Sequence, residues 1–138
     1  MEQWQDPGAE RRALFGLLED VETVNSFFEQ LADDVKWTLY GRHPLAGSYL
    51  GRDEFMPTTI EKVRPLFSKG LRFQITGLHG AGGVTVAEMR GIATAKDGVP
   101  YDPFYVWICR FEDGVIVEVH AYIDSVVVND ILRRLSPE

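Results

Sequence analysis

The sequence has little cysteine, no long apolar run and no cluster of basic residues. Cys109 is the only cysteine of the chain, which excludes an intrachain disulfide and favours a reducing compartment. No stretch reaches the roughly 18 consecutive apolar residues of a membrane span, and the start at Met1 and Glu2 lacks the basic and apolar segments of a secretory signal. We therefore expect a cytoplasmic protein that does not contact a membrane.

Positive charge is also scarce. The chain has 14 lysines and arginines against 21 aspartates and glutamates, for a net charge of -7, and its basic residues are dispersed, which argues against nucleic-acid binding. The glycines Gly41, Gly47 and Gly51 do not match a phosphate-binding loop. His, Cys and acidic residues show no metal-ligand spacing. We expect no metal and no cofactor.

The chain is long enough for one hydrophobic core. Its 138 residues, of which 45% are hydrophobic and 12% aromatic, are too few for two comfortable domains. We therefore treat residues 1–138 as a single domain.

Periodicity divides the chain into a helical half and a strand-rich half. Apolar residues at intervals of three and four predict a helix over residues 9–32, divided at Gly16 or within 20–25. A short strand over 35–40 precedes an ordered loop rich in glycine and proline. Asp53 is then expected to cap a helix that runs toward Phe67, with Pro57 near its first turn.

Four β-prone segments separated by turn residues follow Gly70. They cover residues 71–78, 84–95, 104–111 and 115–123, and Asp113-Gly114 is the clearest turn signal. A short helix over 126–135 closes the chain. This order predicts an α+β fold in which helices pack on one face of a curved antiparallel sheet.

Side-chain alternation gives the sheet two chemically different faces. One parity of the later strands is apolar and aromatic, with Met89, Gly91, Ala93, Tyr105, Trp107, Cys109, Val117, Val119, Ala121 and Ile123. The other parity is charged, with Glu88, Arg90, Arg110, Glu118, His120, Tyr122 and Asp124. The first face is expected to line an internal pocket, and the second to form cross-strand ion pairs or a subunit contact.

The charged parity could also be a catalytic or metal site, because a histidine and carboxylates at two-residue spacing share a strand face. We prefer a structural role for Glu118, His120 and Arg90, because two-residue spacing alone is weak evidence for a catalytic or metal site. Asp102 is interpreted as a turn or strand-edge carboxylate, and Cys109 as core filler without a histidine partner.

His43 is the candidate general base. It lies in the loop after the first strand, where a neutral imidazole could accept a proton near pH 7; the alternative is a histidine that hydrogen-bonds loop backbone. Trp37, Tyr105 and Trp107 are either core or ligand contacts. Their polar tips could orient an oxygen of an otherwise apolar ligand, as could the Tyr40 hydroxyl.

Two stretches resemble the nuclear-transport-factor-2-like (NTF2-like) superfamily, and within it the SnoaL-like group related to ketosteroid isomerases. Residues 28–55, FEQLADDVKWTLYGRHPLAGSYLGRDEF, are similar to the family's first strand and glycine-punctuated loop. Residues 101–124, YDPFYVWICRFEDGVIVEVHAYID, are similar to its final hairpin. The resemblance implies a cystatin-like cone in which a curved sheet wraps around helices and an internal pocket, and a homodimer formed on the outer sheet face.

The family's catalytic residues do not carry over. The isomerase base and its two donors match Leu39, Phe15 and Trp107, of which only Trp107 can donate a hydrogen bond. The epoxide-hydrolase set matches Met89, Gly91 and Ala121, which cannot perform that chemistry. The resemblance nevertheless places these positions on the pocket wall. The expected ligand-binding residues are therefore Phe15, Trp37, Leu39, Tyr40, Met89, Tyr105, Trp107 and Ala121.

The sequence leaves two functions open. The first is binding of a hydrophobic, oxygen-bearing small molecule, turned over by acid–base chemistry as in an isomerase, cyclase or dehydratase if the protein is an enzyme. The second is a non-catalytic small-molecule-binding or dimeric assembly module, because the family's acid–base pair is missing. A nuclear-transport role rests on the fold alone.

Overall fold

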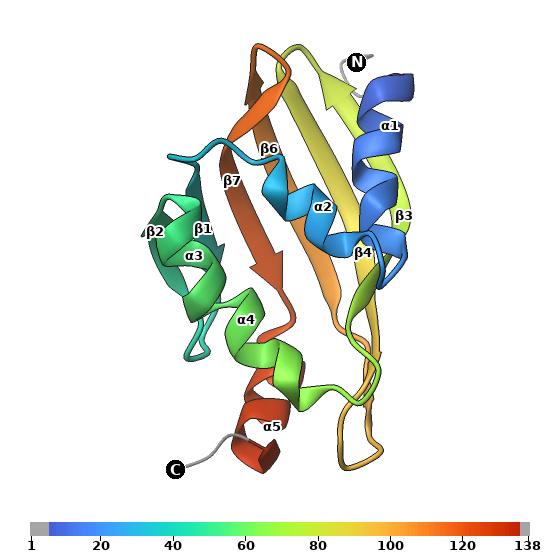
Figure 1. The fold of residues 1–138 in the computed structure, drawn as a ribbon, viewed down its shortest axis with the longest axis vertical. Coiled ribbons are helices and arrows are strands. Elements are labelled where there is room, and N and C mark those ends of the chain that lie inside the picture. Colours follow the sequence, from blue (N-terminus) through green and yellow to red (C-terminus); the bar gives the residue numbers. More distant parts are fainter. Residues whose placement is uncertain (1–5, 136–138) are drawn as a thin grey trace.

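A curved sheet carries the helices on one face (Figure 1). The computed structural model describes residues 6–135. The α-helices are α1 (Ala9–Gly16), α2 (Val24–Glu29), α3 (Arg52–Thr58), α4 (Ile60–Val63) and α5 (Ser125–Leu135), with 3-10 turns η1 (Leu17–Glu19) and η2 (Arg64–Leu66). The strands are β1 (Lys36–Tyr40), β2 (Gly47–Leu50), β3 (Arg72–Ala81), β4 (Val84–Thr94), β5 (Pro100–Tyr101), β6 (Phe104–Glu112) and β7 (Val115–Ile123). The α+β class is thereby confirmed.

The strands follow the order β2-β1-β7-β6-β4-β3, with β5 paired to β4. The predicted antiparallel succession of β3, β4, β6 and β7 is confirmed. One pair differs, because β1 runs parallel to β7, with Trp37 opposite Val119 and Leu39 opposite Ala121. The sheet is therefore mixed, and this parallel pair joins the first half of the chain to its last strand.

The first two helices are divided as predicted, since α1 ends at Gly16 and α2 begins at Val24. The loop after β1 contains a strand that the prediction missed, β2, which pairs antiparallel with β1. An edge strand of four residues needs hydrogen bonds along one side only, so the glycines around it are tolerated. The sequence pattern had no apolar alternation long enough to indicate it.

The helix predicted from Asp53 to Phe67 is broken into three short pieces. Gly51, not Asp53, is the residue that precedes α3, and Pro57 lies inside that helix instead of in its first turn. Thr59 separates α3 from α4 with non-helical dihedrals of φ -123 and ψ -82. Its hydroxyl donates a 2.7 Å hydrogen bond to the Phe55 carbonyl, which pairs a buried polar group at the break.

Alternation sorts β6 as predicted but fails on part of β7. Tyr105, Trp107 and Cys109 are buried. The register between β6 and β7 shifts after Arg110, so the buried residue near the start of β7 is Ile116, and Val117 is only partly buried. A bulge of this kind inserts a residue and reverses the alternation beyond it.

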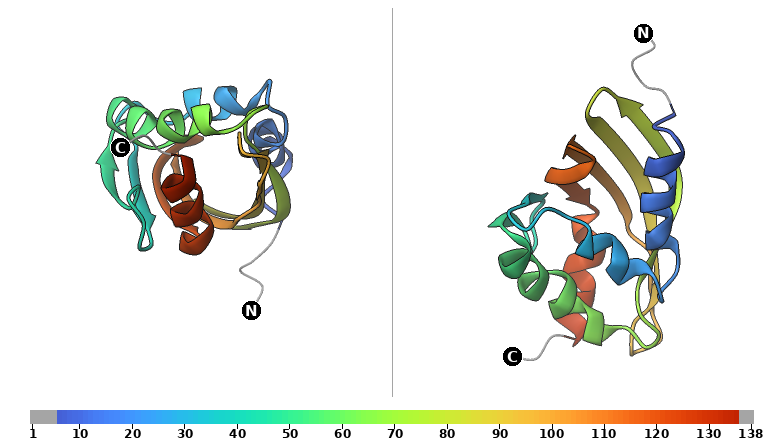
Figure 2. Two further views of the ribbon diagram at one scale, coloured as in Figure 1. Left: turned by 90° about the horizontal axis from the view of Figure 1, so that it is seen from below. Right: turned by 45° about the horizontal axis from the view of Figure 1, so that its top comes forward.

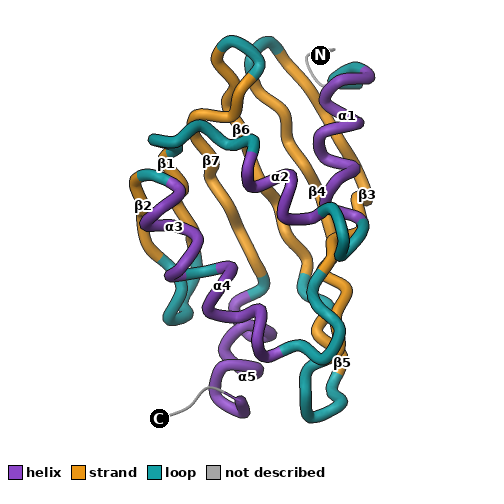
Figure 3. Tube along the Cα trace, viewed as in Figure 1, coloured by secondary structure: helices purple, strands orange, loops and turns teal. Residues whose placement is uncertain are grey.

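Two buried clusters fill the concave side of the sheet. The upper cluster lies under α1, α2 and α3 and includes Phe15, Phe27, Phe28, Trp37, Phe55, Phe73, Met89, Tyr105, Trp107 and Ala121. The lower cluster lies against α5 and consists of Leu45, Val63, Phe67, Ala95, Tyr101, Val128, Ile131 and Leu132. Leu39, Leu71 and Ile123 pack against both. Figure 2 shows α5 across the lower end of the curved sheet, and Figure 3 separates the helices from the strands behind them.

The opposite sheet face carries a cross-strand ion pair, which confirms that expectation. Arg110 on β6 pairs with Glu118 on β7 at 3.2 Å, and the His120 ring, on the same strand as Glu118, contacts that carboxylate at 3.0 Å. Arg90 contacts Asp102 at 2.8 Å, as expected for a strand-edge carboxylate. Exposed pairs of this kind contribute about 0 to 1 kcal/mol each, so their main effect is to keep this face polar.

Within residues 6–135, no helix combines the length and the apolar character that crossing a membrane requires.

Candidate functional site

Five buried aromatic rings meet between the sheet and helices α2 and α3. The Trp37 ring stacks on Phe55 with 4.2 Å between the ring centroids, and it meets Trp107 edge-on with a centroid distance of 4.9 Å. Phe28 lies 6.1 Å from both Phe55 and Trp107, and Phe27 lies 5.8 Å from Trp107. The structure thus brings the predicted ligand residues Trp37 and Trp107 into direct contact.

The other predicted ligand residues divide into three groups. Phe15, Met89, Tyr105 and Ala121 are buried in the same upper cluster as the two tryptophans. Leu39 is half-buried at the seam between the clusters.

Tyr40 does not join them, because it points to the opposite face of β1. Its hydroxyl hydrogen-bonds Nδ1 of His120 at 2.8 Å, and its ring stacks on Tyr122 at 4.6 Å. Trp37 and Tyr40 are three residues apart on a strand, and alternation sends such residues to opposite faces. The expectation that Tyr40 lines the interior is wrong.

His43 has both ring nitrogens engaged by its own loop. Nδ1 accepts a 3.2 Å hydrogen bond from the Leu45 backbone N–H, so Nε2 carries the proton and donates to the Tyr40 carbonyl at 3.3 Å. Desolvation lowers the pKa of His43 below 6.5, against the opposing effect of the Tyr40 hydrogen bond. His43 is therefore neutral near pH 7, and its basic nitrogen faces a backbone donor.

The Trp37 indole N–H is buried without a hydrogen-bond partner in the described part of the chain. Trp37 itself is 2% exposed, so bulk solvent does not reach the indole N–H. An unpaired buried donor costs about 1 to 3 kcal/mol. Such a group is a candidate contact for a ligand oxygen.

A second unpaired donor lies in the Tyr101–Tyr105 pair. The two buried hydroxyl oxygens are 3.3 Å apart. One hydroxyl donates to the other, so the second hydrogen has no acceptor among the described residues. Burial raises the pKa of Tyr101 to about 12 and that of Tyr105 well above 10, so both stay protonated at neutral pH.

The sequence analysis missed Tyr101, because it falls in β5, two residues long. Its pairing places Ala93 opposite Tyr101 and so turns that ring toward the lower cluster. An isolated tyrosine between Pro100 and Asp102 gave no periodic signal from which this could be inferred.

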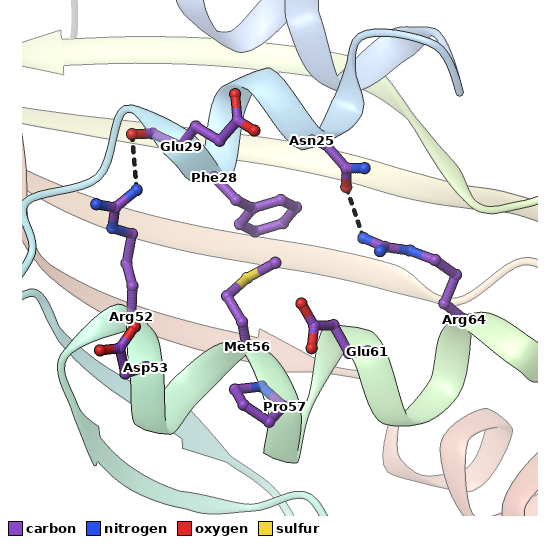
Figure 4. Close-up of a pocket in the computed structure, with 9 residues that line it drawn as sticks. All are labelled: Asn25, Phe28, Glu29, Arg52, Asp53, Met56, Pro57, Glu61 and Arg64. Carbon is purple, nitrogen blue, oxygen red and sulfur yellow. Dashed lines mark hydrogen bonds between the residues drawn. The ribbon is translucent and has the colours of Figure 1, made fainter.

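An open cleft runs along the outside of the helical layer. It has a volume of about 550 Å³ and lies between α2 on one side and α3 and α4 on the other. In Figure 4 the side chains of Phe28 and Met56 point toward each other across it, and charged groups surround them. Its lining residues are Asn25, Phe28, Glu29, Arg52, Asp53, Met56, Pro57, Glu61 and Arg64.

A smaller void lies deeper, between α2, α4 and β3. Its volume of about 20 Å³ is enough for one water molecule but not for an organic ligand. It is lined by Val24, Phe28, Ile60, Val63, Arg64, Leu71 and Phe73. Phe28 and Arg64 line both spaces. The sequence analysis assigned none of the residues that line the void to a site, since an arginine before a proline carries no recognisable motif.

The described residues were compared with two further kinds of site, a metal site and a reactive cysteine. No group of three or more His, Cys, Asp or Glu side chains is placed to hold a metal ion in that part of the chain. Cys109 is fully buried, and burial raises the pKa of its thiol. Since the thiolate is the nucleophile, this cysteine is unreactive where it stands.

Comparison with known proteins adds one sequence relative. A dimerizing cyclase, phiC, from a fungal species (strain ATCC 74256) is 28% identical over 112 residues, which are 78% of this chain and 48% of that protein. The chain thus spans about half the length of this curated relative. No protein-family model matches the chain.

Solved structures resemble the whole chain closely. An NTF2-like protein from Burkholderia thailandensis has a TM-score of 0.72 at 21% identity over 87% of this chain and 92% of its own. A ketosteroid isomerase-like protein from Catenulispora acidiphila, in complex with trimethylamine, has a TM-score of 0.68 at 13% identity, covering 96% and 100%. TerC, co-crystallised with polyporic acid, has a TM-score of 0.66 at 19% identity, covering 90% and 95%.

Sheet order, helical layer and these likenesses agree, and the chain has the NTF2-like fold, an α+β architecture shared with ketosteroid isomerase-like and cystatin-like proteins.

Proposed function

We propose that this protein is a SnoaL-like domain that binds a hydrophobic, oxygen-bearing small molecule beneath helices α2 to α4. The observation that carries the proposal is the unpaired Trp37 indole N–H in an otherwise apolar aromatic cluster. Folding leaves such a donor buried at a cost, and a ligand carbonyl or hydroxyl oxygen would pair it. The spare hydroxyl hydrogen of the Tyr101–Tyr105 pair supports the same ligand chemistry.

The ligand must displace protein atoms in order to enter. The inner void of about 20 Å³ is far below the roughly 300 Å³ of a small-molecule site. Rearrangement of the short α3, α4 and η2 segments would enlarge it, because each is seven residues or fewer and non-helical Thr59 separates α3 from α4.

Of the cyclase, isomerase and dehydratase reactions that the sequence left open, the sequence relative favours a cyclase reaction. The curated relative is a dimerizing cyclase, and TerC was crystallised with polyporic acid. In such a reaction Tyr105 and Tyr101 act as hydrogen-bond donors to a developing oxyanion, since their raised pKa values keep them protonated. His43 serves as base only after its Leu45 hydrogen bond opens.

The proposal is tested with two compounds. The first is 2-acetylnaphthalene, an aromatic ketone, and the second is naphthalene, which has the same ring system without the ketone. Binding is followed through the tryptophan fluorescence of the full chain. We expect the wild-type protein to bind the ketone more tightly than the hydrocarbon, and Trp37→Phe to reduce that preference several-fold, as one lost hydrogen bond of about 1 kcal/mol predicts. Tyr105→Phe is expected to act in the same direction.

Cys109→Ser provides a buried control that removes no proposed ligand donor. Absence of ketone binding to the wild-type protein, or an unchanged preference in both Trp37→Phe and Tyr105→Phe, would overturn the proposal. Native mass spectrometry of the purified protein gives a second readout, because a retained ligand adds its mass to the folded chain.

We also propose that the protein is a homodimer formed on the outer sheet face. Exposed aromatic rings favour this, because Phe104 is 63% and Tyr122 44% exposed on the convex side. The Arg90 guanidinium lies over the Phe104 ring, and Arg110 and Glu118 add both signs of charge to the same face. A face that carries both signs of charge can pair with itself across a two-fold axis. The alternative function, a non-catalytic assembly module, would use the same face.

A further inference from the structure

Arg64 stands where the outer cleft meets the inner void. Phe28 and Arg64 line both spaces, and every other residue around the void is apolar: Val24, Ile60, Val63, Leu71 and Phe73. The carboxylates of the cleft, on Glu29, Asp53 and Glu61, do not line the void. Arg64 is thus the one charged residue among those that line the inner void.

Arg64 has no charged partner among residues 6–135. Its Nη2 donates a 2.6 Å hydrogen bond to the neutral Oδ1 of Asn25, which Figure 4 shows as a dashed line. A guanidinium group has five N–H donors, so most of those on Arg64 find no acceptor among the described residues.

Arg52, at the other end of the cleft, differs from Arg64 because it has a charged partner. It donates to the Glu29 carbonyl at 2.9 Å and forms an ion pair with Asp33. The cleft therefore contains one arginine whose charge is neutralised and one whose charge is available. Only the available one adjoins the void.

Phe73 separates the void beside Arg64 from the candidate ligand donors. It forms the inner wall of the void and contacts Tyr105 at 4.9 Å and Trp107 at 5.3 Å. Arg64 and Val63 belong to the short α4–η2 segment, which begins after Thr59. The rearrangement of this segment proposed above would open the void toward the aromatic cluster and carry Arg64 with it.

We propose that Arg64 is a specificity-determining residue and that the ligand is an apolar ring compound with one anionic group, such as a carboxylate. The anion replaces Asn25 Oδ1 as the partner of Arg64, while the ring lies against Phe28 and Phe73 beneath α4. Arginine suits this role because its planar donors bind a carboxylate through two parallel hydrogen bonds. The inference rests on the proposed function and adds the charge of the ligand to it.

The test compares 2-naphthoate with 2-naphthamide, which share a ring system and differ in charge. Dissociation constants are measured by tryptophan fluorescence for the wild-type chain, Arg64→Gln and Arg52→Gln. We expect the wild-type protein to prefer the carboxylate by about tenfold, as a charge-assisted hydrogen bond of roughly 1.5 kcal/mol predicts. Arg64→Gln should abolish this preference, and Arg52→Gln should retain it. The ratio of the two constants cancels any general loss of affinity from partial unfolding.

Each outcome decides between the proposals. If the amide binds as tightly as the carboxylate to the wild-type protein, or if Arg64→Gln keeps the preference, this inference is wrong and binding of neutral ligands stands. If neither 2-naphthoate nor 2-naphthamide binds to the wild-type protein, this inference and the proposed function are both wrong. Loss of the preference in both arginine variants would assign it to the general charge of the cleft and overturn the role of Arg64.

Discussion

At the scale of single residues, the hydrogen bonds of His43 make it a structural element of its loop. We expect His43→Ala to lower the free energy of unfolding by about 1 to 2 kcal/mol, because it removes two hydrogen bonds, to Leu45 and Tyr40. Urea denaturation measures this loss. His43→Gln, which can keep one of the two bonds, should lose less. An alanine variant as stable as the wild type would show that these bonds contribute nothing.

The lowered pKa of His43 predicts a pH dependence with a definite sign. The unfolded chain binds a proton near pH 6.5, whereas the folded His43 does so only at lower pH because burial disfavours its charge. The unfolded state therefore holds more protons as the pH falls below about 6.5, and stability declines there. We expect His43→Ala to show a smaller decline between pH 7 and 5 in urea titrations. Parallel curves for the two proteins would contradict the prediction.

Alternation predicted the burial of several residues correctly and failed where the strand was irregular. It placed Tyr105, Trp107 and Ala121 in the interior, where they are buried. It could not locate the bulge that buries Ile116 in place of Val117, because a register shift depends on pairing with β6. The unpaired Trp37 N–H could not be predicted from the sequence either, because the lack of a hydrogen-bond partner depends on how the interior packs.

At the scale of elements, α5 closes the lower cluster with its buried face. Ile131 is 2% exposed there, whereas Val126 on the same helix is 77% exposed. We expect Ile131→Ala to cost about 2 to 5 kcal/mol through lost burial and the cavity it leaves. Val126→Ala should change the free energy of unfolding by less than about 0.5 kcal/mol. Equal effects of the two substitutions in urea denaturation would show that α5 is not docked as described.

Elements with strong periodic signals were predictable, and those defined by tertiary contacts were not. The break between α1 and α2 and the four long strands follow from turn residues and apolar spacing. The short β2 and β5 exist because β1 and β4 pair with them. The interruption at Thr59, which sets Arg64 beside the void, has no local sequence signal, because threonine is tolerated within helices.

At the scale of the whole molecule, the outer sheet face predicts an association equilibrium. We expect the wild-type chain to sediment as a dimer at micromolar concentration. Phe104→Glu should yield a monomer, because it replaces the most exposed aromatic ring of this face with a charge. Val21→Glu, between η1 and α2, alters an exposed valine away from the sheet and should remain dimeric. A wild-type protein that sediments as a monomer would refute the dimer.

The parallel pairing of β1 with β7 also constrains how the chain folds during synthesis. Thr38 lies opposite His120, so β1 and its hairpin partner β2 have no sheet to join until β7 has left the ribosome. The β3 to β7 strands, by contrast, pair with neighbours close in sequence and can assemble as they emerge. Long-range pairing is slow, so joining the β1–β2 hairpin to the sheet should be the late kinetic step, and nascent chains should need protection from aggregation until then.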